Sequence, residues 1–248
     1  APRVAVIGGS FIGAEIASAC SALGLDTTVV EALPAPLEPV LGPCVARVAA
    51  GLHADNGVRL LCGIPVSGLR GHGRVTGVDL ADGTVVPADV VVMGIGAKPA
   101  TAWLEGSGLE LDDGVVCGTG LLTGVGGVAA VGDVARLRDA DGTSFRPEHW
   151  TAAAQQPAVA AANLLAGSTV QEYRRAPYFW SDQYGVRLQF AGRAGPADEV
   201  RVVEGSLEER SFAAVYERDG AVTAAAAMDR PRSFTRLRRS IGRAAAPV

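Results

Sequence analysis

A strand, a glycine-rich turn, a helix and a second strand follow one another at the start of the chain, and this order constrains the fold most. Residues 3–7 are a β-branched apolar run that ends in Gly8-Gly9-Ser10-Phe11-Ile12-Gly13. Residues 14–24 carry apolar side chains at helical spacing, and residues 27–30 predict a second strand that ends on Glu31. Such a turn directs amide groups and the positive end of a helix dipole at one anion-sized site. The pattern predicts a doubly wound α/β domain that binds the pyrophosphate of a dinucleotide.

The glycine turn departs from the usual dinucleotide fingerprint at one position. Gly8 allows the tight turn and Gly13 allows close helix–strand packing, but Ser10 stands where the middle glycine is usual. Its side chain either crowds the phosphate or donates a hydrogen bond to it. A purely structural turn is the alternative for the whole loop.

Two acids follow the turn. Glu31 at the end of the second strand can accept both ribose hydroxyls of an adenosine and would repel a 2′-phosphate, which favours NADH over NADPH. The alternative is a solvated acid at a strand end. Glu15 is expected in the first helical turn, where it either complements the helix dipole or contacts the nicotinamide end of the coenzyme.

The next part of the chain continues the α/β pattern. We expect a helix at residues 44–56, a third strand at 58–62 and a small antiparallel excursion at 66–80 and 85–87. Residues 89–95 form an apolar run that is typical of a strand at the centre of a parallel sheet.

The pattern changes to short strands near Gly114. A strand at 128–131 is expected to run into Gly132-Asp133, and an alanine-rich helix is expected at 148–165, closed by Gly167. Alternating strands are then predicted at 186–190, 200–203, 212–217 and 221–228, before a basic helix at 233–243. That helix is either a solvated face or part of a docking surface for an acidic protein.

Composition excludes several classes of protein. The 248 residues are 48% hydrophobic and 19% charged, which excludes disordered and fibrous chains. A net charge of −4 gives no overall attraction to nucleic acid or acidic lipid. We find no apolar run of the ~18 residues that a membrane span needs and no signal peptide, so we expect a cytoplasmic protein without nucleic-acid or membrane partners.

The four cysteines are dispersed at Cys20, Cys44, Cys62 and Cys117. A redox dithiol, a zinc site or an iron–sulfur cluster needs closer or more numerous thiols. We therefore expect buried free thiols and no metal.

Several motifs together resemble one enzyme family. They are the turn from Gly8 to Glu15, residues 114–133, Glu148-His149-Trp150 and the string Phe179-Trp180-Ser181-Asp182-Gln183-Tyr184. The chain resembles, over essentially its whole length, the FAD-dependent NADH:ferredoxin reductases of the rubredoxin and putidaredoxin type, which are cousins of the apoptosis-inducing-factor-like reductases. The aromatic string is the most specific part. Its alternative is the core of a small sheet, although Asp182 and Gln183 within it favour a site over a core.

The resemblance implies three parts and one reaction. Residues 1–115 would be an NAD-binding domain, 116–170 the C-terminal part of an FAD-binding domain, and 171–248 a C-terminal α+β domain. Hydride would pass from NADH to FAD, and single electrons would leave to a ferredoxin-type iron–sulfur protein, so the cofactor carries the chemistry and the protein orients it.

The resemblance also assigns cofactor-binding residues and no certain catalytic residue. The NAD residues would be Gly8, Gly9, Ser10, Phe11, Ile12, Gly13, Glu15, Glu31 and Gly96. The FAD residues would be Gly132, Asp133, Glu148, Trp150, Gln156 and Trp180, with Glu148, Trp150 and Gln156 on one helix.

The sequence departs from the family pattern. Ala152 stands where Asn is common and Gly118 where Asp is common. The family's first glycine fingerprint, which holds the FAD adenosine, has no counterpart here, so we expect a fragment or truncated form that needs a complementary FAD-domain chain to bind FAD. One alternative is a non-catalytic NAD(H)-binding short form or a subunit of a separate flavoprotein. A minimal flavoprotein with FAD in the single fingerprint, and the dithiol branch of the superfamily, are weaker rivals.

Overall fold

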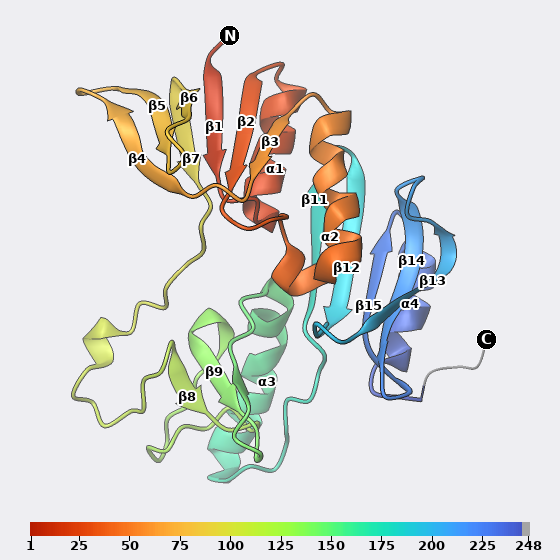
Figure 1. Ribbon diagram of the computed structural model, residues 1–248. Coiled ribbons are helices and arrows are strands. Elements are labelled where there is room, and N and C mark those ends of the chain that lie inside the picture. The colour runs from red at the N-terminus through yellow and green to blue at the C-terminus, as the bar shows by residue number, and fades with distance from the viewer. Residues whose placement is uncertain (245–248) are drawn as a thin grey trace. The chain divides into compact units, whose positions relative to one another are not determined.

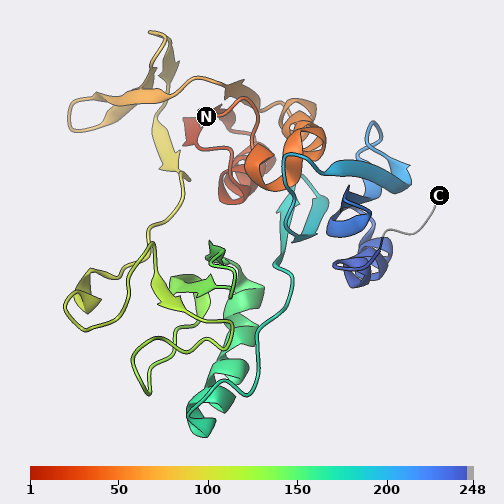
Figure 2. The same cartoon turned by 60° about the horizontal axis from the view of Figure 1, so that its bottom comes forward.

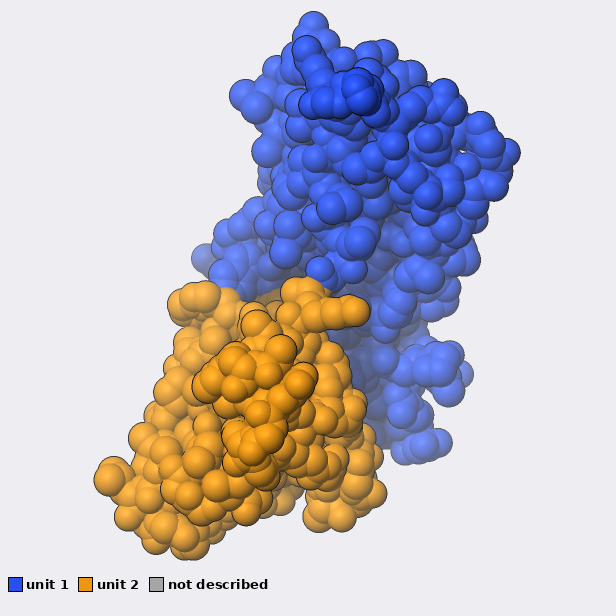
Figure 3. Space-filling view, turned by 90° about the vertical axis from the view of Figure 1, so that its left-hand side faces the viewer, with its two compact units in different colours: residues 1–96, 180–248 blue, residues 97–179 orange. Residues whose placement is uncertain are grey.

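The computed structural model describes residues 1–244, which form two compact units. Residues 1–96 and the chain from 180 onward make up unit 1, and residues 97–179 make up unit 2 (Figure 3). The mixture of parallel and antiparallel sheets with helices confirms the expected α/β and α+β fold class. The three domains expected at 1–115, 116–170 and 171–248 stay a prediction.

Unit 1 begins with a parallel sheet in the order β3-β2-β1-β7 (Figure 1). Its strands are β1 (Arg3–Ile7), β2 (Asp26–Glu31), β3 (Arg59–Cys62) and β7 (Val90–Met93). The prediction that residues 89–95 lie at the centre of the sheet is wrong, because β7 is its outer strand. Val91 packs into a core beneath a second sheet, whereas Met93 is 64% exposed. A partly covered edge strand can therefore have the same apolar pattern as a central one.

Two layers cover β1. On one face lies the predicted antiparallel excursion, β4 (Val66–Gly71), β5 (Val75–Leu80) and β6 (Val85–Pro87). Ala5 and Ile7 of β1 pack there against Val78 and Val86. On the other face Val4 and Val6 pack against Ala17 of α1. Burial on both faces explains the continuous apolar run of β1.

Both helices of this part begin earlier than predicted. The helix α1 (Phe11–Ala22) starts directly after its N-cap Ser10. The helix α2 (Glu38–Asp55) starts at Glu38 rather than at the predicted residue 44 and is interrupted at Gly42, where φ is 68°. Since Pro43 follows, it acts as the first residue of the resumed helix, where its missing N–H costs little.

The C-terminal part of the chain is a five-stranded antiparallel sheet in the order β11-β12-β15-β14-β13 (Figure 1 and Figure 2). The strands are β11 (Tyr178–Gln183), β12 (Val186–Gly192), β13 (Glu199–Ser206), β14 (Ser211–Arg218) and β15 (Ala221–Met228), which confirms all four predicted strands. The predicted basic helix 233–243 is wrong in extent, since α4 (Pro231–Leu237) gives way to the 3-10 turn Arg238–Ser240.

Hydrogen bonds tie this sheet to α2 within unit 1. Tyr216 is buried and its hydroxyl donates to Leu41 O over 2.6 Å. Arg210 donates to Val48 O over 2.9 Å and also pairs with Asp55. Gly51 faces this guanidinium, and a Cβ there would lie 2.4 Å from Arg210 Nη1. The antiparallel sheet and the parallel-sheet part of unit 1 therefore form one packed body.

Unit 2 holds three short strands, α3 (Trp150–Ala166), and the 3-10 turns Ala102–Leu104 and Gly132–Val134. The strands are β8 (Val115–Cys117), β9 (Ala135–Arg138) and β10 (Ser144–Phe145). Figure 1 and Figure 2 show α3 beside β8 and β9, and Ala160 packs there with Val115 and Leu137. As predicted, the helix ends at Gly167, whose φ of 67° suits a left-handed cap.

The strand predicted at 128–131 does not form. A single bridge between Leu122 and Ala129 is present instead. The hydroxyl of Thr123 contacts Val125 O and Val128 O, both at 3.1 Å. Such local side-chain bonds close a loop and compete with extended pairing.

The cysteines are free, but the prediction of burial is wrong for three of them. Cys117 is buried, and burial raises the pKa of its thiol to about 11. Cys20, Cys44 and Cys62 are half-buried. Within residues 1–244, no helix has the length and apolar character needed to cross a membrane.

Candidate functional site

A cavity of about 610 Å³ opens at the carboxyl ends of β1, β2 and β7. Its lining includes Ser10, Phe11, Glu31, Ile64 and Gly96. The volume lies in the range of small-molecule sites, ~300–1,000 Å³. The strand order reverses direction between β1 and β7, and ligands of open α/β sheets bind at such a switch point. The cavity is therefore in the position expected for a dinucleotide.

The glycine turn can only be built from glycine at its two ends. Gly8 has a φ of 97°, and a Cβ there would lie 2.5 Å from Gly94 O. A Cβ on Gly13 would lie 2.0 Å from Gly8 O. Both distances are far below a normal contact, so the turn brings the backbone of β1, α1 and the end of β7 as close as the fold allows.

Glu31 is fixed by two backbone donors. Gly9 N donates to its Oε2 over 2.8 Å, and Leu33 N donates to its Oε1 over 2.8 Å. The carboxylate thus lies at the end of β2, half-buried and on the cavity wall. This geometry suits a group that accepts the hydroxyls of a ribose.

The hydroxyl of Ser10 forms two hydrogen bonds with the backbone of unit 1. It donates to Gly94 O over 2.9 Å and accepts a hydrogen bond from Gly13 N over 3.2 Å. Ser10 is the N-cap of α1. The next two residues differ in burial, since Phe11 is half-buried on the cavity wall and Ile12 is 65% exposed.

The expectation that Glu15 lies in the first helical turn is wrong, because α1 begins at Phe11 and has no acid in its first turn. Glu15 instead meets the aromatic string. Ser181 Oγ donates to Glu15 Oε1 over 2.7 Å, and Asp182 N donates to the same oxygen over 3.2 Å. Glu15 is not among the residues that line the cavity. The structure therefore joins two motifs that the sequence could only name separately.

The sequence did not predict a contact between His53 and Tyr184. Tyr184 occupies the turn between β11 and β12 with a φ of 53°, and its backbone N donates to Ser18 Oγ over 2.7 Å. Its hydroxyl lies 2.7 Å from His53 Nδ1, and burial lowers the pKa of His53 to about 4. The imidazole is therefore neutral. The two residues are 131 positions apart, and no local pattern links them.

Three of the candidate flavin residues meet in unit 2. Gly132 N donates to Gln156 Oε1 over 2.6 Å, and Gly132 has a φ of 71°. Gln156 is fully buried, and its Nε2 has no hydrogen-bond partner among the described residues. A buried amide donor needs an acceptor, so this orphan atom fits a missing polar group beside the turn that carries Asp133.

Arg146 was not predicted from the sequence either, and it connects two of the candidate residues. Its side chain is 8% exposed and donates to Asp133 O over 2.9 Å and to Glu148 Oε1 over 2.5 Å. Its Nε and Nη2 also donate to the two oxygens of the Asp113 carboxylate, each over 3.3 Å. The prediction that Glu148 lies on the helix is wrong, because His149 is the N-cap of α3. Glu148 is an acceptor for Arg146 just before the helix begins.

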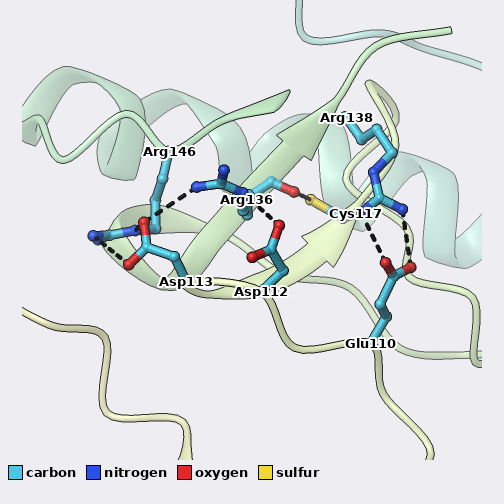
Figure 4. Close-up of polar contacts among 7 residues, drawn as sticks. All are labelled: Glu110, Asp112, Asp113, Cys117, Arg136, Arg138 and Arg146. Carbon is cyan, nitrogen blue, oxygen red and sulfur yellow. Dashed lines mark hydrogen bonds and ion pairs between the residues drawn. The ribbon is translucent and has the colours of Figure 1, made fainter. Parts of the chain in front are cut away.

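Further ion pairs surround Arg146 (Figure 4). Arg136 lies 3.1 Å from Asp113, and Arg138 lies 2.7 Å from Glu110 and lowers the pKa of that carboxyl. These pairs fix the loop before β8 against β9. The remaining candidates are surface residues, since Trp150 is 74% exposed in unit 2 and Trp180 is 39% exposed in unit 1.

Comparison with known proteins places the chain in a family. The model of the pyridine nucleotide-disulphide oxidoreductases matches residues 1–157, and the model described as reductase C-terminal matches residues 178–248. The chain is 38% identical, over 96% of its length, to the ferredoxin reductase subunit of 5,5′-dehydrodivanillate O-demethylase from Sphingobium sp., and it covers 58% of that protein. It is 36% identical, over 99% of its length, to the ferredoxin–NAD(+) reductase component of the anthranilate 1,2-dioxygenase system of Burkholderia cepacia, and it covers 60% of that protein.

A solved structure supports the same family assignment. The ferredoxin reductase for the CYP199A2 system of Rhodopseudomonas palustris superposes with a TM-score of 0.91 at 32% identity, over 99% of this chain and 61% of that one. The chain thus spans about three-fifths of the length of the proteins that it matches. The resemblance carried by the glycine turn and the aromatic string is confirmed. The chain belongs to the pyridine nucleotide-disulphide oxidoreductase family and carries a reductase C-terminal domain.

Proposed function

We propose that this chain supplies the NADH-binding and C-terminal parts of an FAD-dependent reductase that passes electrons from NADH to a ferredoxin-type iron–sulfur protein. The observation that carries the proposal is the cavity at the carboxyl ends of β1, β2 and β7, with the Gly8 to Gly13 turn on one wall and the fixed Glu31 carboxylate on another. The names of the relatives, which are ferredoxin reductases, support the choice of electron acceptor.

The chain's own residues have distinct tasks in this proposal. Gly8 and Gly13 let the backbone approach the pyrophosphate, while the N-terminus of α1 offers amides and a positive dipole end. Glu31 accepts the adenosine ribose hydroxyls and repels a 2′-phosphate, which selects NADH. Phe11, Ile12, Gly96 and Glu15 complete the proposed coenzyme-binding set.

The proposed flavin residues lie in unit 2, apart from Trp180. When bound, FAD supplies the chemistry that accepts a hydride and releases single electrons. Gln156 accepts from the Gly132 amide through Oε1 and offers its Nε2 as a donor, and Arg146 holds the Asp133 carbonyl and Glu148 in place. The electron acceptor, the complementary FAD-domain segment and the cytoplasmic location remain proposals.

The experiment begins with calorimetric titration of the chain with NADH and NADPH. We expect NADH to bind and NADPH to bind at least about 10-fold more weakly. The protein extended by its FAD-binding segment is then mixed with NADH without oxygen, and we expect the flavin absorbance near 450 nm to bleach and an added [2Fe–2S] ferredoxin to be reduced. Binding of NADH without flavin bleaching would favour the non-catalytic NAD(H)-binding form, and no binding would contradict the proposal.

A further inference from the structure

The glycine turn is held on both sides by a side chain. On the β2 side, Gly9 N donates to Glu31 Oε2 over 2.8 Å. On the β7 side, Ser10 Oγ donates to Gly94 O over 2.9 Å. The strands β2 and β7 are the two neighbours of β1. The turn after β1 is therefore braced against the residues that follow each adjacent strand.

The single donor of the Ser10 hydroxyl is used by this arrangement. It has one proton, which goes to Gly94 O, and one of its lone pairs accepts the hydrogen bond from Gly13 N. While these bonds persist, the hydroxyl has no proton for a phosphate. A glycine at this position would remove the bonds to both Gly94 O and Gly13 N.

The β7 side of the brace is also a close approach between two backbone segments. Gly94 N donates to Ile7 O over 2.7 Å, and Gly94 O lies 2.5 Å from the position that a Cβ on Gly8 would occupy. Both Ser10 and Gly94 line the cavity. The Ser10 side chain thus joins two walls of the cavity where their backbones lie close together.

We propose that Ser10 is a positioning residue that fixes the Gly8 to Gly13 turn against Gly94 before the coenzyme binds. The inference rests on the proposed function, because the ligand is taken to be NADH. A loop that is already in its bound conformation loses less conformational entropy on binding, so the brace increases affinity without a contact between Ser10 and the ligand. The substitution of the usual glycine by serine is then a gain in rigidity.

The test compares four variants of the chain. Ser10→Ala removes both hydrogen bonds. Ser10→Gly removes them while it keeps a favourable N-cap residue, so it separates bracing from helix capping. Ser10→Thr keeps the hydroxyl. The matched control is Ser21→Ala, since Ser21 lies in the same helix and its hydroxyl also donates to a backbone carbonyl, Asn56 O at 3.0 Å, away from the cavity.

Two readouts are used, and the first needs no ligand. In the free chain, we expect Ser10→Ala and Ser10→Gly to speed amide hydrogen exchange in residues 8–13 and 94–96, while Ser10→Thr and Ser21→Ala leave these segments unchanged. By calorimetry, we expect the first two variants to bind NADH about 5- to 10-fold more weakly, which is the loss of one or two ordinary hydrogen bonds.

The outcomes separate the possibilities. Unchanged exchange in Ser10→Ala and Ser10→Gly would overturn the brace, as would NADH affinity that is unchanged or tighter in these variants; tighter binding would mean that the side chain crowds the phosphate. Weaker NADH binding with unchanged exchange would instead indicate direct contact with the ligand and would also overturn it. If the wild-type chain does not bind NADH, the proposed function fails, while the exchange data still decide whether Ser10 holds the turn.

Discussion

Ser181 Oγ donates a 2.7 Å hydrogen bond to Glu15 Oε1, and 166 positions of sequence separate the two residues. Ser181 is fully buried and accepts a hydrogen bond from Gln183 Nε2 over 3.0 Å. Because the NH₂ group of Gln183 can only donate, the Ser181 proton must point to Glu15. This directed chain of donors connects the edge strand β11 to α1, so the C-terminal sheet and the parallel-sheet part of unit 1 share a partly buried polar contact.

Replacing Ser181 by Ala tests how much this contact contributes to the stability of the fold. The substitution removes the donor to Glu15 and leaves the buried Gln183 Nε2 without its acceptor, so we expect the free energy of unfolding to fall by about 1–3 kcal/mol. Urea denaturation followed by circular dichroism measures the change. The matched control is Ser67→Ala, since Ser67 is exposed and donates to Asp79 O over 3.1 Å. We expect it to change stability by less than about 0.5 kcal/mol, and equal effects of the two variants would contradict the prediction.

The buried His53 makes stability depend on pH. Its pKa is lowered by burial from 6.5 to about 4, so between these values the unfolded chain binds a proton that the folded chain does not. Stability from this residue is complete above pH 6.5 and is lost as the pH falls through 4, by about 3 kcal/mol in total. The measurement is the unfolding free energy of wild type and His53→Gln from pH 7 to 4.

The difference in unfolding free energy between wild type and His53→Gln separates the contribution of this histidine from that of the carboxylates, which titrate in the same pH range. We expect the advantage of wild type over His53→Gln to shrink as the pH falls. His72→Gln is the matched control, because His72 is exposed in the turn between β4 and β5. A constant difference between wild type and His53→Gln across this range would show that His53 is not held neutral by the fold.

Local patterns predicted the elements well, and the reason is visible in β1 and its turn. The apolar run of residues 3–7, the glycine spacing and Glu31 all lie within one short segment, residues 3–31, and contact one another in the fold. Gly167 likewise ends α3 where predicted, because a left-handed cap is a local property.

The wrong predictions concern features that depend on residues far away in the sequence. Whether the strand β7 is central or at the edge depends on which strands pair with it, and its own residues do not encode this. The partners of Glu15 and His53 come from the β11–β12 hairpin, more than a hundred positions away. Arg146 is one of many arginines in the sequence, and only the fold shows that it is buried among three acceptors.

Arg146 is expected to support the candidate flavin residues of unit 2. Arg146→Ala removes a nearly buried guanidinium from Asp113, Asp133 O and Glu148, and we expect a loss of about 1–3 kcal/mol of unfolding free energy. Arg146→Lys keeps the charge but not the planar fork, so it should recover only part of this. Chemical denaturation measures both variants.

A surface arginine provides the control for Arg146. Arg174 pairs with Glu172 and is 73% exposed, so Arg174→Ala is expected to cost less than about 0.5 kcal/mol. If Arg146→Ala were as mild as Arg174→Ala, the ion pairs around Asp113 would contribute nothing beyond ordinary surface pairs, and the role of Arg146 in holding Asp133 and Glu148 would be contradicted.

Glu31 is expected to set both affinity and the choice of coenzyme. The Glu31→Gln amide keeps one oxygen, so it can accept from only one of Gly9 N and Leu33 N, and its NH₂ group would face the other donor. We expect NADH to bind about 10-fold more weakly, the loss of a charged hydrogen bond. NADPH should lose less, because the charge that repels its 2′-phosphate is gone. Calorimetric titration gives both affinities.

Asp26→Asn is the matched control at the opposite end of β2, where the side chain is exposed and away from the cavity. An NADH-to-NADPH preference in Glu31→Gln equal to that of Asp26→Asn would mean that the Glu31 carboxylate does not face the adenosine ribose.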